Sequence, residues 1–217
     1  IGSKFLESEL AQDSIKVRQY LQDLEAEFPN LQKIALVGRL PNFVMKAGIP
    51  IASPYVDGSM GTRYMIWDVA RQMRSLPDYI GETSIVVLGG AGRIGNKVCE
   101  DLAREFSTVV AFDPRYDQEE KIFTPLGMIL RTAKPLRLAE HKLFIGLTHH
   151  GDVIEELQPH LTPGSLIADD THPSITPRVR EVLAASHIKV MKIVLSHEEF
   201  SMWPRMPAWN NRDIPGC

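Results

Sequence analysis

A glycine-rich hexapeptide lies between two segments of regular apolar spacing in this chain of 217 residues. Its residues follow the pattern G-x-G-x-x-G and are Gly90, Ala91, Gly92, Arg93, Ile94 and Gly95. Residues 85–88 before it have the composition of a buried strand, and residues 93–106 after it have helical spacing. A glycine turn between a strand and a helix can bring backbone N–H groups to a phosphate, and the positive end of the helix dipole favours that anion. The motif therefore predicts a pyrophosphate-binding turn.

Each glycine of the motif has its own predicted role. Gly90 allows the tight turn, and Gly92 lets the backbone approach the pyrophosphate closely. Gly95 lets the helix pack close to the preceding strand. We expect Arg93 and Ile94, which open the helix, to complete this part of the cofactor site.

The choice of dinucleotide depends on the end of the next predicted strand, residues 108–112. That strand runs into Asp113, whose carboxylate can accept both hydroxyls of an adenosine ribose and would repel a 2′-phosphate. NAD is therefore the expected cofactor. Arg115 follows two residues later, and an arginine at this place can hold a 2′-phosphate, so NADP remains an alternative.

Polar clusters follow the three later strands of the predicted sheet. The carboxyl ends of parallel strands form the ligand crevice, so these clusters should meet on the nicotinamide side. We expect cofactor contacts from Thr148, His149, Asp169 and Thr171. His150, His172 and His197 complete the set of histidines at these strand ends.

Hydride transfer at a carbon that bears oxygen or nitrogen needs a matched proton transfer, and histidine suits that near neutral pH. His172 is the first choice for the catalytic group, with His150 and Asp170 beside it. Each has a structural alternative, because loop histidines and aspartates also cap helices and turns. A metal held by His150, His172, His197 and an aspartate has suitable ligand chemistry, but the spacings match no short metal motif and no metal is expected.

The elements that must position these residues alternate between strand and helix after residue 81. This alternation predicts an α/β fold, a doubly wound and mostly parallel Rossmann sheet covered on both faces. Residues 81–217 form that predicted domain. Residues 1–80 form a small, mainly helical N-terminal region for substrate binding or dimerisation. It has a first helix that ends near Phe28, a strand at 34–37, a stretch at 39–59 that is irregular or contains short elements, and a helix at 62–76.

The glycine loop and the second strand resemble the NAD-binding domain of the D-2-hydroxyacid dehydrogenases. The residues that carry this resemblance are Val87 to Gly95 and Val109 to Pro114, because the family loop commonly reads G-x-G-R-I-G and its second strand commonly ends in Asp-Pro. Residues 164–172 are similar to a stretch of S-adenosylhomocysteine hydrolase in which a histidine lies beside the nicotinamide. These resemblances imply NAD binding. They do not extend to the dehydrogenases' arginine after this strand, where the present chain has Asp169, Asp170, Thr171 and His172.

The composition limits the kinds of partner and the cellular compartment that we expect. The formal net charge is -3, so the chain has no basic excess to neutralise nucleic-acid phosphates. No apolar run approaches the ~20 residues that would span a bilayer, and the first residues lack the pattern of a signal peptide. Two cysteines, Cys99 and Cys217, argue against a disulfide-stapled secreted domain. We expect a cytoplasmic protein without a nucleic-acid or membrane partner, and a homodimer through the first helix or the tryptophan-containing tail at 202–209.

The function that unites these features is an NAD-dependent dehydrogenase or reductase. It would transfer hydride between the nicotinamide and a small polar substrate of hydroxy, keto or amino acid-like character. Two alternatives stay open at this point. One is an enzyme with tightly bound NAD of the S-adenosylhomocysteine hydrolase type, and the other is a non-catalytic NAD-binding regulatory protein.

Overall fold

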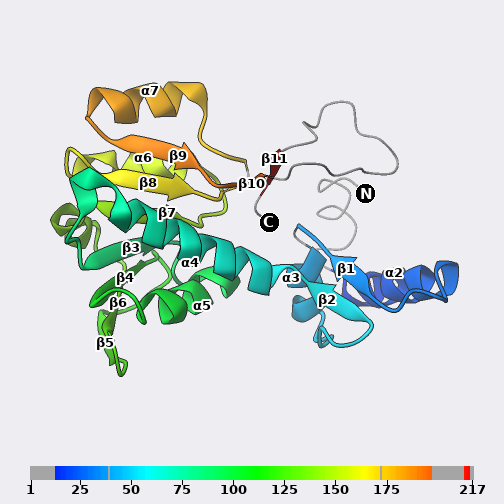
Figure 1. Ribbon diagram of the computed structural model, residues 1–217. Coiled ribbons are helices and arrows are strands. Elements are labelled where there is room, and N and C mark those ends of the chain that lie inside the picture. Colours follow the sequence, from blue (N-terminus) through cyan, green and yellow to red (C-terminus); the bar gives the residue numbers. More distant parts are fainter. Residues whose placement is uncertain (1–12, 39, 172, 197–212, 216–217) are drawn as a thin grey trace. The chain divides into compact units, whose positions relative to one another are not determined.

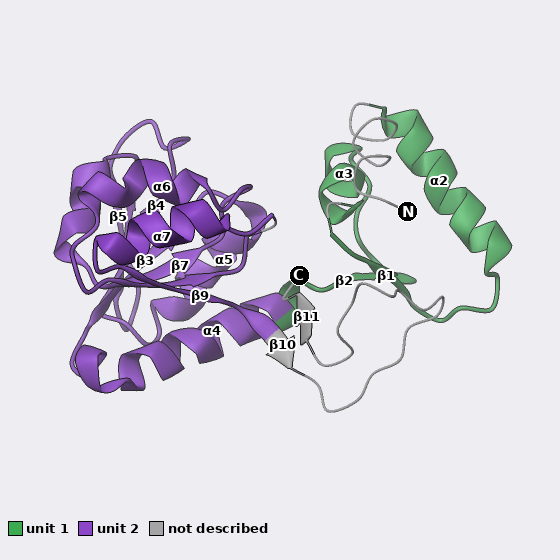
Figure 2. Cartoon of the chain, turned by 90° about the horizontal axis from the view of Figure 1, so that it is seen from above, with its two compact units in different colours: residues 1–61, 217 green, residues 62–216 purple. Residues whose placement is uncertain are grey.

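The computed structural model describes residues 13–38, 40–171, 173–196 and 213–215. The chain divides into two compact units, residues 1–61 with 217 and residues 62–216 (Figure 2). The start of the predicted first helix and the tail at 202–209 lie outside the described residues. No helix in the described part of the chain is both long enough and apolar enough to cross a membrane.

Unit 1 is a small α/β body around its own apolar cluster. Its elements are α2 (Ser14–Glu27), β1 (Ile34–Leu36), α3 (Leu40–Lys46) and β2 (Tyr55–Asp57), with β1 and β2 parallel. The Asp13 side chain caps α2 by accepting from the backbone N–H groups of Ile15 and Lys16. The buried cluster consists of Val17, Leu21, Leu36, Leu40, Phe43, Val44 and Tyr55. The stretch at 39–59 therefore contains short elements, the helix α3 and the strand β2.

Unit 2 contains a seven-stranded sheet with the order β5-β6-β4-β3-β7-β8-β9 (Figure 1). All neighbouring strands are parallel except β5, which runs antiparallel to β6 at the edge. The strands are β3 (Ser84–Leu88), β4 (Thr108–Phe112), β5 (Glu120–Phe123), β6 (Met128–Thr132), β7 (Leu143–Gly146), β8 (Leu166–Asp169) and β9 (Lys189–Lys192). The predicted α/β class with a mostly parallel, Rossmann-like sheet is confirmed.

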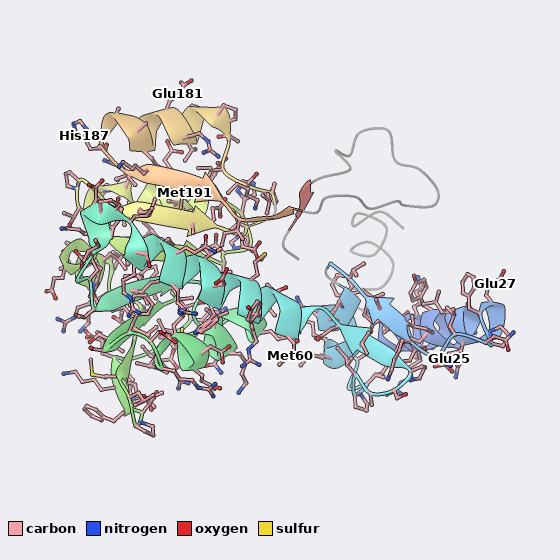
Figure 3. The ribbon with its side chains drawn as sticks, in the orientation of Figure 1. Glu25, Glu27, Met60, Glu181, His187 and Met191 are labelled. Atoms are coloured by element: carbon pink, nitrogen blue, oxygen red, sulfur yellow. The ribbon has the colours of Figure 1, made fainter. Side chains whose placement is uncertain are left out.

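Helices cover both faces of the sheet because alternate strand residues point to opposite sides. Ile85 and Val87 of β3 pack in the cluster that includes residues of α4 (Ser59–Ser75) and α5 (Arg93–Leu102). Val86 and Leu88 pack with residues of α6 (Val153–Leu157) and α7 (Pro177–Ala185). In Figure 3, Glu181 projects from α7 away from the sheet, and His187 lies just after the end of this helix.

The division between the two units lies between residues 61 and 62 rather than at the expected 80 and 81. The reason is the packing of α4. The buried cluster on the first face of the sheet also contains Met65, Ile66, Ala70 and Met73 of α4, so this helix is part of the Rossmann core rather than of the N-terminal region.

The segment between residues 117 and 140 adds two strands to the sheet. β6 pairs in parallel with β4, and β5 forms an edge hairpin with β6. Gly127 makes this possible, because a Cβ there would lie 2.5 Å from the carbonyl oxygen of Phe106. The remaining elements are the short 3-10 helices Pro77–Tyr79, Pro135–Glu140 and Gln158–His160 and the antiparallel pair β10 (Val194–Ser196) and β11 (Asp213–Pro215).

Candidate dinucleotide-binding site

The glycine loop is held against the neighbouring strand by backbone hydrogen bonds. The N–H groups of Gly89 and Gly90 both donate to the carbonyl of Phe112 at the end of β4, at 2.9 and 3.0 Å. Gly92 N–H donates to the carbonyl of Gly89 at 3.0 Å. Gly89 has a φ of 91°, in the left-handed region that favours glycine. The loop therefore turns sharply as soon as β3 ends.

Two motif glycines lie where a side chain has no room. A Cβ on Gly90 would lie 2.8 Å from the Cβ of Ala111 on β4. A Cβ on Gly95 would overlap the carbonyl oxygen of Gly89, which is backbone and cannot swing away. These positions set how closely α5 and the loop pack against the strands.

Gly92 is the residue that opens α5. It has an extended conformation, with φ of -68° and ψ of 161°, and it offers no side chain to cap the helix. A Cβ there would lie 3.1 Å from the Gly89 carbonyl oxygen and 3.9 Å from Nη2 of Arg115. The start of this ten-residue helix is thus bare of a capping side chain and close to a guanidinium group. Such a helix N-terminus favours an anion.

Asp113 and Arg115 form a bidentate ion pair at the end of β4. Oδ1 accepts from Nε of Arg115 at 2.9 Å and Oδ2 from Nη2 at 2.8 Å. The backbone N–H groups of Arg115 and Ala91 donate to the same carboxylate at 3.1 Å. Burial opposes ionisation of Asp113, but these hydrogen bonds outweigh it and lower the pKa. The predicted ribose acceptor is therefore already engaged by Arg115, whose side chain remains 63% exposed.

The loop after β7, which contains His149 and His150, forms hydrogen bonds within itself. Thr148 Oγ1 donates to the carbonyl of His150 at 2.8 Å, and Asp152 N–H donates to Nδ1 of His150 at 3.1 Å. An Nδ1 that accepts leaves the proton of the neutral ring on Nε2. In this arrangement His150 can donate a hydrogen bond through Nε2, while His149 is exposed.

Two carboxylates that are consecutive in the sequence are buried at the end of β8. Asp169 and Asp170 are 1% and 7% exposed, and Thr171 is 2% exposed. Asp169 Oδ1 accepts from the Thr171 hydroxyl at 2.6 Å and from its N–H at 3.1 Å. Oδ2 of Asp169 and Oδ1 of Asp170 are buried, and neither has a hydrogen-bond partner among the residues that the structure describes. Unsatisfied buried acceptors are uncommon and point to a functional constraint.

The Asp170 carboxyl has a higher pKa than an ordinary aspartate. Burial raises the pKa of its carboxyl to about 6, Lys192 opposes this shift, and Asp169 adds to it. Lys192 ends β9 in register with Asp169, and its ammonium donates to the carbonyl of Thr171 at 2.6 Å. The sequence reasoning missed Lys192, because a lysine at a strand end carries no local motif. Only the pairing of β8 with β9 places it here.

The sheet order brings the three loop regions together. Leu88 of β3 pairs with Phe112 of β4 on one side and with Gly146 of β7 on the other, and Gly146 pairs with Asp169. Glycines again allow close approach. A Cβ on Gly89 would lie 2.6 Å from the carbonyl oxygen of Leu147, and one on Gly146 would lie 2.9 Å from Oδ1 of Asp169. The motif residues, Asp113 and the β8 carboxylates therefore share one edge of the sheet.

Two predicted site residues, His172 and His197, lie outside the described residues. Within the described ranges, no group of three or more histidine, cysteine, aspartate or glutamate side chains is arranged to hold a metal ion. Cys99 is buried in α5, and burial raises the pKa of its thiol to about 12, which suits a packed core residue rather than a nucleophile.

A separate hollow of about 510 Å³ occurs within unit 1. Its lining is mostly apolar and consists of Met45, Gly48, Ile49, Pro50, Ile51 and Asp57. It offers one carboxylate and no cluster of polar groups, so it lacks the convergent polar atoms that mark most small-molecule sites.

Comparison with known proteins gave no match to a protein-family model and no match to a curated protein sequence. Solved structures do show similarity at low identity. A D-isomer specific 2-hydroxyacid dehydrogenase from Xanthobacter autotrophicus Py2 is 20% identical with a TM-score of 0.44, over 88% of this chain and 69% of that one.

An NADPH-dependent glyoxylate/hydroxypyruvate reductase from Sinorhizobium meliloti, solved with NADP and sulfate, is 15% identical with a TM-score of 0.44, over 74% of this chain and 58% of that one. The A chain of dipicolinate synthase from Bacillus subtilis is 14% identical with a TM-score of 0.41, over 74% of this chain and 54% of that one. All of these are likenesses of general fold.

Proposed function

We propose that unit 2 binds a nicotinamide dinucleotide and that the chain is an NAD(P)-dependent oxidoreductase acting on a small polar substrate. The observation that carries this proposal is the glycine loop. Close backbone atoms leave no room for a side chain at Gly90 or Gly95, and Gly92 contributes no capping side chain at the start of α5. A strand, a turn of this shape and a helix together form a cradle that fits a pyrophosphate.

The neighbouring strand end supports the same assignment. Asp113 and Arg115 lie beside the loop, where the adenosine ribose of a dinucleotide would be recognised. Asp113 favours NAD, and Arg115 provides a cation for a 2′-phosphate. Because the two side chains are paired, we propose that NAD is preferred by a narrow margin and that NADP also binds.

The second half of the crevice supplies polar groups for the substrate. When bound, a nicotinamide supplies a hydride acceptor or donor. Asp170 can exchange a proton near neutral pH, because burial raises its pKa to about 6. His150 can donate a hydrogen bond to a substrate oxygen through Nε2. The two loops are held by hydrogen bonds from Thr148 to the His150 carbonyl and from Thr171 to Asp169.

The direct test is a fluorescence titration of the protein with NADH and with NADPH, repeated on Gly92→Val. We expect saturable binding to the wild-type protein and affinity at least about tenfold weaker in the variant, because a branched side chain would block the pyrophosphate path. Unchanged affinity in a folded Gly92→Val protein would show that the glycine loop is not part of the dinucleotide site.

Turnover assays on the wild-type protein then distinguish the three functional classes. Net change in the absorbance of the reduced nicotinamide with added substrates supports a dehydrogenase or reductase. Cofactor that co-purifies and shows no net change during turnover supports transient oxidation by tightly bound NAD. Binding with no turnover across hydroxy, keto and amino substrates supports a regulatory protein and contradicts the enzymatic part of the proposal.

A further inference from the structure

The helix α4 has two faces of different character. The face toward the sheet carries the apolar side chains that are buried in the core of unit 2. The outer face carries four residues with the spacing i, i+3, i+4 and i+7, which places them on one side of the helix. They are Tyr64, Trp67, Asp68 and Arg71. Figure 2 shows α4 along the outside of unit 2, so this second face is turned away from the sheet.

Two aromatic rings and a guanidinium group form one stack on this outer face. The ring centroids of Tyr64 and Trp67 are 5.7 Å apart, and Cζ of Arg71 lies 4.7 Å from the centroid of the Trp67 ring. Tyr64 is 67% exposed and Arg71 is exposed, while Trp67 packs partly against the core. Tryptophan, tyrosine and arginine are the residue types that contribute most to binding at protein interfaces. Their stacking on one helix face therefore indicates a docking surface.

The charged groups of the outer face differ from those on the flank of α4 that adjoins α5. On that flank, Arg63 forms a bidentate ion pair with Asp101, at 2.7 and 2.8 Å. On the outer face, Arg71 has no carboxylate partner within the described part of the chain. Asp68 accepts a hydrogen bond from Gln72 at 2.6 Å, and no cation of the described residues pairs with it. The outer face thus offers one cation and one anion to a partner.

These residues are complementary to a second copy of themselves. Two α4 helices can pack antiparallel about a twofold axis that passes between Trp67 and Asp68. Arg71 of each copy then lies level with Tyr64 of the other, because both positions are equally far from the axis. The guanidinium group can stack on that ring and reach Asp68 within one helical turn. The two Trp67 side chains meet at the centre, where interface residues contribute most to affinity.

We propose that the outer face of α4 is the interface of a homodimer, in which a second copy of this chain covers Tyr64, Trp67 and Arg71. A nucleic acid fits this face less well, because Asp68 and the net charge of -3 repel phosphates. The sequence alone directed the dimer contact to the first helix or to the tail at 202–209, and this proposal places it on α4 instead. It is independent of dinucleotide binding.

Sedimentation equilibrium on the full chain measures the dimer directly. We expect the wild-type protein to have twice the chain mass of 24.4 kDa at high concentration. Tyr64→Lys should raise the dissociation constant of the dimer by at least about tenfold, because it removes a ring from the interface and sets a cation against Arg71 of the second copy. Ile80→Lys is the matched control, since Ile80 is 74% exposed and lies beyond the end of α4. It should leave the dissociation constant unchanged.

A pair of charge reversals tests the contact across the axis. Arg71→Asp sets two carboxylates against each other in its own homodimer, and Asp68→Arg sets two guanidinium groups against each other. Each variant alone should be monomeric where the wild-type protein is a dimer. An equal mixture of the two should form a mixed dimer, because every cross-axis contact then joins opposite charges. Circular dichroism of each variant confirms that it is folded.

Three results would overturn this inference. A wild-type chain that stays monomeric up to about 100 μM shows that no second copy covers α4. A dimer that survives Tyr64→Lys, or that Ile80→Lys weakens equally, uses another surface. A mixture of Arg71→Asp and Asp68→Arg that stays monomeric removes the proposed pairing. None of these results bears on dinucleotide binding, so the proposed function stands or fails separately.

Discussion

The glycine loop after β3 and the acidic end of β8 lie at the same edge of one sheet but are built on different physical principles. In the loop, backbone donors and acceptors bond to one another, and the limiting quantity is space. At the end of β8, the limiting quantity is charge, because two carboxylates are buried and each has an oxygen for which the described part of the chain provides no donor. The first region should respond to side-chain volume and the second to protonation and polarity.

The largest effect is expected from a volume change in the loop. Gly95→Val places a branched side chain against the carbonyl oxygen of Gly89 and should lower the free energy of unfolding by about 3 kcal/mol or more. Urea denaturation followed by circular dichroism measures this change.

Gly61→Ala provides the control for that loop variant. A Cβ at Gly61 has no atom within 4 Å, and the residue lies inside α4. This change should stabilise the protein by up to about 1 kcal/mol, because alanine is the better helix former. Equal stability of the two variants would show that space is not what limits the loop.

The second effect concerns charge and pH at the end of β8. The pKa of Asp170 is raised from its usual 3.8 to about 6 in the folded protein. The unfolded chain therefore ionises first as the pH rises, and the stabilising contribution of the protonated carboxyl is present below about pH 4 and lost as the pH passes through 6.

Asp170→Asn removes this dependence. Relative to the variant, the wild-type protein should lose up to about 3 kcal/mol of unfolding free energy between about pH 4 and pH 8. Denaturation at several pH values measures the difference, with Glu181→Gln as the control for loss of one carboxylate. A constant difference between wild type and Asp170→Asn across this range contradicts the raised pKa.

A smaller effect is expected from the polarity of Thr171. Its hydroxyl donates to Oδ1 of Asp169 at 2.6 Å, and both residues are buried. Thr171→Val should reduce the unfolding free energy by about 1–3 kcal/mol, because the carboxylate loses a donor that water does not replace. Thr171→Ser keeps the hydroxyl and should retain most of the stability in the same denaturation experiment. Similar losses in both variants would assign the effect to packing of the methyl group.

The smallest stability change is expected at Arg115. Its side chain is largely exposed, so loss of the ion pair in Arg115→Ala should cost less than about 1 kcal/mol. The informative measurement is the ratio of NADH to NADPH affinity, which should shift toward NADH by about tenfold, because Asp113 is freed and the cation for a 2′-phosphate is lost. An unchanged ratio would show that Arg115 has no part in recognising the ribose, and a shift toward NADPH would contradict its role as the cation for a 2′-phosphate.

Local patterns accounted for much of unit 2. The apolar runs of β3, β4, β7 and β8 and the helices after them follow from periodicity, and the motif glycines lie where the strand-turn-helix reading placed them. Periodicity does not predict β5 and β6, whose short and mixed sequences have no clear period, and it does not show that α4 belongs to the Rossmann core rather than to the N-terminal region. Its apolar stripe was visible, but the stripe alone does not say which core it joins.

The sequence by itself determined the α/β class, the turn after β3 and the chemical types of the residues at the strand ends, because these depend on contacts between near neighbours along the chain. Only the tertiary structure decided that Arg115 bonds to both oxygens of Asp113 and that Lys192 of β9 lies in register with Asp169 of β8. It also decided that two buried carboxylate oxygens have no donor among the described residues. Those facts depend on sheet order, burial and the directions of side chains from separate strands. Whether a polar atom has a hydrogen-bond partner, and which pKa a carboxyl has, depend on groups that only the fold brings together.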